Sequence, residues 1–131
     1  MTKASDYLEN AFLNHVLRGN VGATAMAQPS GAYLALHIAD PTEDATGAEL
    51  TGGSYERQLV EFDEPIDGVA INSSEVIFSG LPTGTVKFLA FWDALENGNM
   101  TFYSDEIIPN ITLNANDEIT IAAGIISISL D

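Results

Sequence analysis

Apolar residues in the first part of the chain recur at the spacing of a helix. Within residues 5–18 they lie three or four positions apart, which places them on one helical face. Ser5 or Thr2 is suited to cap the start of the helix, and Arg18 followed by Gly19 is typical of its end. The sequence therefore predicts one amphipathic helix, whose apolar face consists of Leu8, Phe12, Leu13, Val16 and Leu17.

The pattern changes after this helix. Residues 19–31 mix small residues with turn formers and show no periodicity, so they are predicted to form an extended connector. Residues 32–39 then alternate as in a strand, but the second side of the strand is only weakly polar. We expect both faces to be covered, and we expect His37 to be a hydrogen-bonded residue between elements rather than a catalyst.

The rest of the chain consists of short segments of strand length separated by turn residues. They are rich in β-branched and aromatic residues, and Asn97-Gly98 is typical of a hairpin turn. The pattern predicts a mainly β fold, a single sandwich of about seven strands, immunoglobulin-like or jelly-roll-like, with one N-terminal helix. The expected division is a helix and connector at 1–31 and a β-sandwich at 32–131. The expected strands after the first are 54–62, 75–78, 85–93, 100–104, 119–122 and 125–130.

Charge narrows the range of partners. The 131 residues include four Lys and Arg but nineteen Asp and Glu, for a net charge of −15. Such a chain repels nucleic-acid phosphates and anionic membranes, so neither is an expected partner. Without cysteine it has no disulfide, thiolate metal site or cysteine nucleophile. The polar N-terminus leads into no apolar segment, so we expect a soluble product without a signal peptide.

Candidate chemistry is sparse. The acidic segments 40–49 and 61–67 lack the regular ligand spacing of a calcium loop, so a solvated surface is expected, with no metal and no cofactor. No serine-hydrolase elbow occurs, and paired carboxylates are too common in this chain to indicate a glycosidase. The protein is therefore predicted not to be an enzyme. A sugar-binding face is a weaker alternative, for which the stacking residues would be Trp92, Tyr33, Tyr55 and Tyr103.

Several segments, taken in order, resemble a family of small bacteriophage virion proteins. They are residues 13–19, 33–42 and 52–58, the pair Asn72-Ser73, and the terminal strand after 122–124. Members of the family are described as tail-fibre-type or accessory structural proteins. The resemblance implies a virion component, made in the host cytoplasm, whose partners are phage capsid or tail proteins.

Two roles follow from this resemblance. A chain of this length without repeats is too short for a fibre shaft, which favours a capsid decoration or cement subunit, and a tail-fibre or baseplate module is the alternative. Either role requires apolar contact surface. We expect a homo-oligomer, and among the possible oligomers a trimer is favoured. The predicted assembly contacts are Leu8, Phe12, Leu13, Val16, Leu17, Ile126, Ile128 and Leu130.

Overall fold

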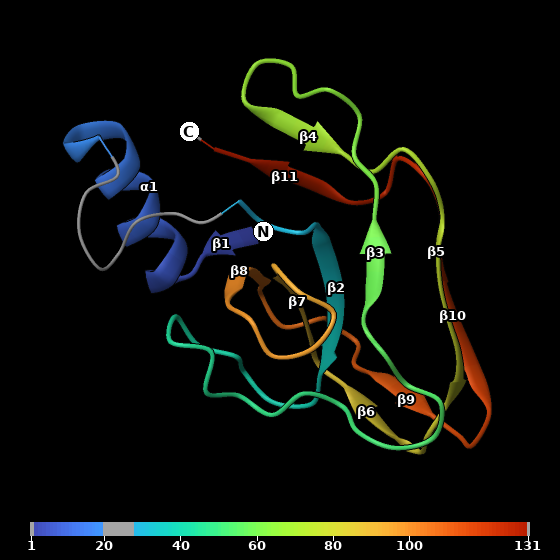
Figure 1. Cartoon of the computed structure of the whole chain (residues 1–131). Helices are drawn as coiled ribbons and strands as arrows, with labels where there is room; N and C mark the ends of the chain where they lie inside the picture. Colours follow the sequence, from blue (N-terminus) through green and yellow to red (C-terminus); the bar gives the residue numbers. More distant parts are fainter. Residues whose placement is uncertain (1, 20–27, 131) are drawn as a thin grey trace.

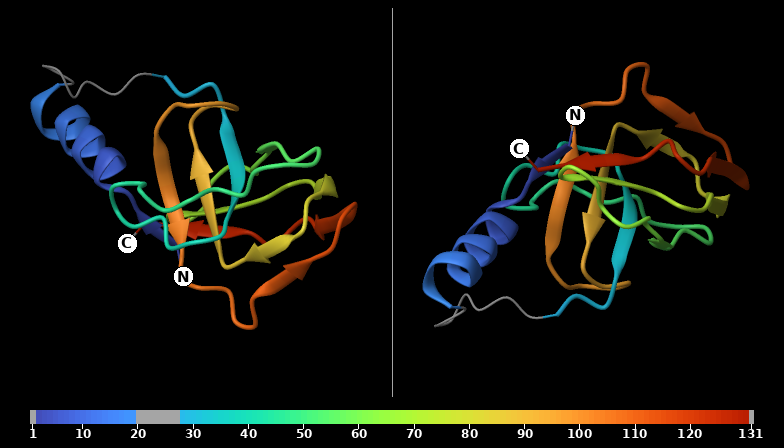
Figure 2. Two further views of the ribbon diagram at one scale, coloured as in Figure 1. Left: turned by 90° about the horizontal axis from the view of Figure 1, so that it is seen from below. Right: turned by 90° about the horizontal axis from the view of Figure 1, so that it is seen from above.

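The structure, a computed structural model, describes residues 2–19 and 28–130 of the chain. In these ranges it is mainly β, with one helix and eleven short strands. A five-stranded sheet faces a layer of two-stranded ribbons (Figures 1 and 2). The predicted class, a sandwich-like β fold with an N-terminal helix, is confirmed, with more and shorter strands than the expected seven. The predicted connector at 19–31 lies largely outside the described residues.

Helix α1 spans Asp6–Arg18, as predicted. The Ser5 hydroxyl accepts a hydrogen bond from the N–H of Leu8 at 3.2 Å and donates one to the carbonyl of Met100 at 2.5 Å. The N-cap therefore also attaches the helix to the sheet. Gly19, at φ 65°, ends the helix in the left-handed conformation that glycine adopts readily. No helix in the described ranges is long and apolar enough to cross a membrane.

A strand that the sequence pattern does not predict precedes this helix. Strand β1, Thr2–Ala4, pairs antiparallel with β8, Met100–Ser104, at one edge of the five-stranded sheet. The N–H of Ser5 continues the contact by donating to the carbonyl of Thr101 at 2.9 Å. The N-terminal segment is thus bonded into the sheet. The division of the chain at residue 31 stays a prediction.

The five-stranded sheet has the order β1-β8-β7-β2-β3. Strand β7, Phe88–Trp92, pairs antiparallel with β8 and with β2, Ala32–His37, while β3, Gln58–Val60, forms the other edge. The last four residues of β2 are buried, so both of its faces are covered, as predicted. The β7–β8 hairpin turns through Asn97 and Gly98, which both have positive φ, as the Asn-Gly signal predicts.

The opposite layer is made of short antiparallel pairs. Three of them occur: β4 (Val69–Ile71) with β11 (Ser127–Ser129), β5 (Val76–Leu81) with β10 (Asp117–Ile121), and β6 (Gly84–Val86) with β9 (Ile111–Leu113). The predicted strand at 85–93 is divided between β6 and β7. The two strands are separated at Lys87, whose N–H donates to the carbonyl of His37 at 2.9 Å and whose carbonyl accepts the N–H of Ile107, a residue outside the strands, at 2.7 Å.

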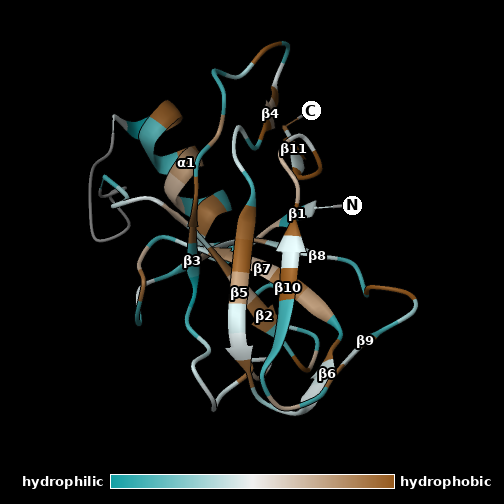
Figure 3. Ribbon diagram, turned by 90° about the vertical axis from the view of Figure 1, so that its right-hand side faces the viewer, coloured by the Kyte–Doolittle hydropathy of each residue, from teal (hydrophilic) through white to brown (hydrophobic). Residues whose placement is uncertain are grey.

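The main core lies between the two layers. Leu34, Leu36 and Phe91 of the five-stranded sheet pack with Val76 and Phe78 of β5, among others. Along β5 buried and exposed residues alternate at its start, which is the period of a strand covered on one face. Figure 3 shows apolar colour along much of β5 and alternating apolar and polar bands on α1.

A buried asparagine joins two of the ribbons. Asn72, which is 1% exposed, lies between β4 and β5. Its side-chain oxygen accepts the N–H of Ile126 at 2.8 Å, and its amide group donates to the carbonyls of Ser74 at 2.9 Å and Ala122 at 3.1 Å. Its own carbonyl accepts the N–H of Gly124 at 2.9 Å. Two segments of the family resemblance, Asn72-Ser73 and 122–124, are therefore parts of one joint.

Candidate functional site

Four predicted contact residues lie together on the outer face of α1. Their side chains are well exposed, at 48% for Phe12, 52% for Leu13, 57% for Val16 and 73% for Leu17. The buried residues of this helix are Ala11 and Asn14. At 100° per residue these two lie on the opposite side of the helix from the exposed four. The helix therefore presents an apolar face to solvent.

The other predicted contacts lie in or beside the core. Leu8, Ile128 and Leu130 line an apolar groove of about 440 Å³, together with Phe91, Phe102 and other residues. Leu130 is 59% exposed at this groove, but Ile128 is only 9% exposed and belongs to the main core. Ile126 also packs against that core. These two isoleucines accordingly offer little surface to a partner, and the contact role of the set stays a prediction.

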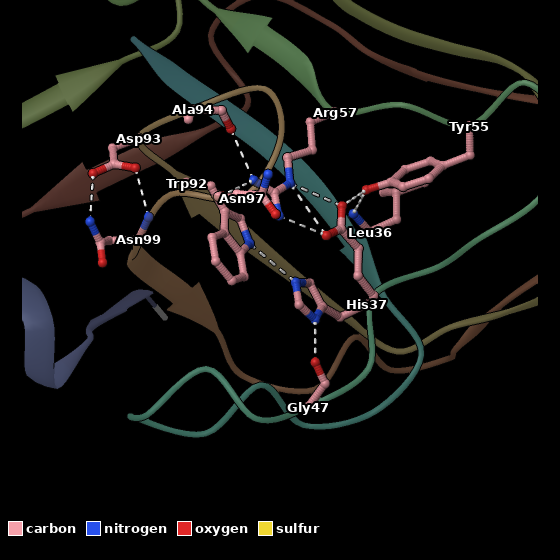
Figure 4. Close-up of polar contacts among 11 residues, drawn as sticks. Leu36, His37, Gly47, Tyr55, Arg57, Trp92, Asp93, Ala94, Asn97 and Asn99 are labelled. Atoms are coloured by element: carbon pink, nitrogen blue, oxygen red, sulfur yellow. Dashed lines mark hydrogen bonds and ion pairs between the residues drawn. The ribbon is translucent and has the colours of Figure 1, made fainter. Parts of the chain in front are cut away.

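A polar cluster surrounds Arg57, a residue that is only 8% exposed (Figure 4). Arg57 donates to the Glu49 carboxylate from Nη2 at 2.9 Å and from Nε at 3.1 Å. Its Nη1 donates to the carbonyls of Ala94 at 2.9 Å and Asn97 at 2.8 Å, both in the β7–β8 hairpin loop. The guanidinium carbon lies 4.1 Å from the centre of the Trp92 ring. Charge-assisted bonds and a cation–π contact thus fix this side chain on three sides.

Glu49 has a second partner in the cluster. The Tyr55 hydroxyl donates to Glu49 Oε2 at 2.5 Å and accepts the N–H of Leu36 at 3.0 Å. Burial raises the pKa of Tyr55, and the hydrogen bond to Glu49 raises it further. The phenol therefore stays protonated at neutral pH. The cluster thereby ties the loop before β3 to the middle of β2.

His37 is the second polar residue of the cluster that contacts Trp92. Its Nδ1 lies 3.2 Å from the carbonyl of Gly47, and Trp92 Nε1 donates to its Nε2 at 3.4 Å. These partners assign the hydrogen to Nδ1, because Nε2 acts as the acceptor. The two rings are nearly parallel, with an interplanar angle of 1° and ring centres 6.2 Å apart. The prediction that His37 is a hydrogen-bonded residue between elements is confirmed.

This arrangement also bears on the sugar-binding alternative. One face of Trp92 is covered by the Arg57 guanidinium. Tyr103 is 5% exposed, and the hydroxyl of Tyr55 is bonded inside the polar cluster. Of the four aromatic residues considered for stacking on a sugar, Tyr103 is therefore buried, and Trp92 and Tyr55 are half-buried and already in contact with other side chains.

The acidic segment 40–49 uses its carboxylates to shape its own backbone. Asp40 Oδ1 accepts the N–H of Thr42 at 2.9 Å, and Asp44 accepts the hydroxyls of Thr42 and Thr46. The hydrogen bond from Thr42 and, to a smaller extent, the one from Thr46 lower the pKa of the Asp44 carboxyl. Within 2–19 and 28–130, no group of three or more His, Asp or Glu side chains is placed to hold a metal ion.

Sequence reasoning missed the polar cluster as a unit. Tyr55 and Arg57 are two positions apart, which places them on the same side of an extended segment, and this is a weak signal. The partners Glu49, His37 and Trp92 come from other segments. Only the fold brings them together.

We expect stability to depend on pH through His37. Burial lowers the pKa of its imidazole, so the unfolded chain, with a histidine pKa of about 6.5, binds the proton more readily than the folded chain. The His37 contribution is complete above about pH 7 and is lost as the pH falls through 6.5 toward the lower folded pKa. The Tm, followed by the fluorescence of the single tryptophan, is therefore expected to fall between about pH 7.5 and 5.5.

A matched pair of variants isolates this effect. His37→Gln is expected to flatten the Tm profile over that range, whereas His15→Gln, a change of the exposed helix histidine, is expected to keep the slope. Equal slopes for the two variants would contradict the assignment to His37.

The described part of the chain is a small β-sandwich with a polar cluster in which Arg57 and His37 are buried. Apolar side chains are exposed on a helix and at a groove. Exposed apolar surface of this kind is typical of proteins that contact other proteins. Residues 3–129 match the family described as podophage GP4 fiber I protein gp80, and the chain belongs to this family. It is therefore a bacteriophage virion structural protein of the fibre type, as the sequence resemblance indicates. No curated protein matches the chain.

Proposed function

We propose that this protein is a non-enzymatic subunit of the fibre apparatus of a phage particle, held to neighbouring virion proteins by exposed apolar surface. The observation that carries the proposal is the family match, which extends over residues 3–129 and is described in terms of a fibre. It favours the tail-fibre alternative over the capsid decoration role that chain length favours.

The internal polar cluster supports a structural role. Arg57, Glu49, His37 and Trp92 bond to one another or to the main chain, and Arg57 and His37 are buried. Side chains whose polar atoms are bound within the protein in this way are typical of a structural role. Their bonds hold the β7–β8 hairpin loop and the loop before β3 against the sheet.

The groove lined by Leu8 and Leu130 is the surface that we assign to the neighbouring virion protein. Its lining is almost wholly apolar, and it lies where α1, the five-stranded sheet and β11 meet. Burying such a groove supplies the hydrophobic contribution that a lasting contact requires. Leu130 is the most suitable position for a test, since its side chain is 59% exposed and its removal leaves the core packing in place.

The location of the protein is tested by its copy number in purified virions, measured by quantitative mass spectrometry against the major capsid protein. We expect the low copy number of a fibre component, set by the symmetry of the tail. A ratio near one copy per capsid subunit would overturn the fibre assignment and restore capsid decoration. Labelling of the protein at the tail in electron micrographs is the second expected result.

The attachment surface is tested by Leu130→Glu. A carboxylate at this groove is costly to bury, so the variant, supplied in trans to phage that lack the gene, is expected to be incorporated into virions at least about tenfold less. Ile125→Glu is the matched control, because Ile125 is 68% exposed, does not line the groove and gains the same charge. Equal incorporation of both variants would place the contact elsewhere. Point substitution is preferable to deletion of residues 1–18, which would also remove β1 from the sheet.

A further inference from the structure

We propose that the apolar groove receives side chains from a segment of the neighbouring virion protein in which lysine or arginine flanks apolar residues. This partner chemistry rests on the proposed function, in which the groove contacts that neighbour. Two features carry it, namely the apolar lining of the groove and a row of unpaired carboxylates along its border.

The groove lies between the two layers of the sandwich. Phe91 and Phe102 of the five-stranded sheet line it from one layer, and Ala70 of β4 and Ile128 of β11 line it from the other. Its volume of about 440 Å³ is at the low end of the range of about 300–1,000 Å³ for pockets that hold small molecules. A few apolar side chains fill such a space, whereas a helix of about 10–12 Å diameter does not fit inside it. The partner therefore inserts side chains rather than a whole element.

One border of the groove is formed by an acidic segment. Phe62 and Gly68 line the groove, and the exposed residues Asp63, Glu64 and Asp67 lie between them in the sequence. We call these three carboxylates the acidic rim. A segment that enters the groove passes beside them.

The backbone of the acidic rim is fixed next to the groove. The N–H of Asp63 donates to the carbonyl of Ile71 at 2.9 Å, which attaches the start of the rim to β4. Asp67 and Gly68 have φ values of 51° and 76°, as in a two-residue hairpin turn. The carbonyl of Gly68 accepts the N–H of Leu130 at 2.9 Å. The end of the rim is thereby bonded to a residue that lines the groove.

The acidic rim has no basic partner within the described residues. The chain has four Lys and Arg, and in the ranges 2–19 and 28–130 the ion pairs join Lys3 to Asp105 and Arg57 to Glu49. Lysine or arginine of a neighbouring segment supplies the missing cations, and the net charge of −15 attracts such a segment from a distance. A second copy of the chain brings the same negative charge and is therefore a poor occupant of the groove.

The groove and the rim contribute differently to binding. Burial of apolar side chains in the groove drives association. Exposed ion pairs at the rim add little affinity each, but they speed the encounter and disfavour partners of the wrong charge. A basic segment is thus expected to bind more tightly than an acidic one with the same apolar residues.

The role of the rim is tested in virions with the variant Asp63→Asn/Glu64→Gln/Asp67→Asn. It removes three charges and keeps the side-chain shapes, and asparagine tolerates the positive φ at position 67. In cells that supply the variant and the unchanged protein together, we expect at least about threefold less of the variant in virions, because three ion pairs are lost. Quantitative mass spectrometry of purified particles gives the ratio.

The matched control is Glu56→Gln/Glu75→Gln/Glu96→Gln, which removes the same charge from exposed residues outside the groove lining. It is expected to be incorporated like the unchanged protein. If the rim variant behaves like this control while Leu130→Glu is poorly incorporated, the basic partner is refuted and the groove assignment stands. If Leu130→Glu is incorporated normally, the groove assignment itself is refuted.

The chemistry of the partner is tested with synthetic peptides that have blocked ends, added to the isotope-labelled full chain. The peptide Lys-Leu-Phe-Lys is expected to shift the amide resonances of groove residues such as Ala70, Phe102 and Ile128. Glu-Leu-Phe-Glu is expected to bind at least about tenfold more weakly. Equal affinities of these two peptides would overturn the proposal. Equal binding of Lys-Ser-Ser-Lys would also overturn it, because attraction to charge alone would then account for the shifts.

Discussion

Replacement of Arg57 by methionine is expected to lower the free energy of unfolding by about 3 kcal/mol, measured by urea denaturation. Methionine keeps much of the apolar stem but loses the bonds to the Glu49 carboxylate and the two bonds to the hairpin loop. Removal of one partner of a buried ion pair typically costs about 3–5 kcal/mol, because the other charge is left behind. The Glu49 side chain is 22% exposed, so water partly compensates, and the lower end of that range applies.

Lys87→Met is the matched control for this change. It removes the same charge from a partly exposed side chain and is expected to change the unfolding free energy by less than about 0.5 kcal/mol. A double variant, Glu49→Met/Arg57→Met, is expected to be less destabilised than the sum of the two single changes, since no unpaired charge remains. A loss for Arg57→Met no larger than that for Lys87→Met would mean that the cluster contributes little to stability.

Substitution of Asn72 is expected to be the second costly change. Asn72→Ala removes one acceptor and two donor contacts from the joint between the ribbons, for an expected loss of about 2 kcal/mol. Asn72→Asp is expected to cost more, about 3 kcal/mol. Its carboxylate still accepts from Ile126, but it faces the carbonyl oxygens of Ser74 and Ala122 without a hydrogen to donate.

The order of the variants is the informative result. Asn114→Ala, in an exposed turn, is expected to stay within about 0.5 kcal/mol of the unchanged protein. If Asn72→Asp were as stable as Asn72→Ala, the two carbonyl contacts would not matter. Urea denaturation followed by the fluorescence of Trp92 provides the measurement for all three proteins.

Local signals in the sequence predict the helix well. Ser5, the first-turn acids, Arg18 and Gly19 all act within a few residues of the helix ends, so the ends can be read without knowledge of the fold. The same holds for β2 and for the Asn97-Gly98 hairpin, where alternation and turn chemistry are local properties.

Elements that depend on distant pairing are not predictable in this way. Strands β1, β4 and β9 have only three residues each, too few for a period of two to be distinguished. Their extended conformation is fixed by β8, β11 and β6, respectively. The division of 85–93 likewise follows from the bonds of Lys87 to His37 and Ile107, which belong to other segments.

The polar cluster could not be predicted from the sequence either, because its side chains come from distant segments. His37 is recognisable from its place on an apolar strand, but the ion pair of Arg57 with Glu49 is indistinguishable from surface charge in a chain with so many carboxylates. The predicted assembly contacts could be read from the sequence only in part. Helical periodicity groups Phe12, Leu13, Val16 and Leu17 on one face but does not tell whether the face is covered, whereas Ile126 and Ile128 belong to the core.

The pairing of β1 with β8 has a consequence for how the protein is made. Ser5 bonds to Met100, 95 positions later, so β1 and Ser5 have no pairing partner until β8 has been synthesised. At typical rates of about 5–20 residues per second, this delay is roughly 5–20 s. A helix of this length is marginally stable in water without its tertiary contacts. We therefore expect α1 to fold stably only after β8 has left the ribosome. Any contact that another molecule makes through α1 is thereby confined to chains synthesised beyond β8.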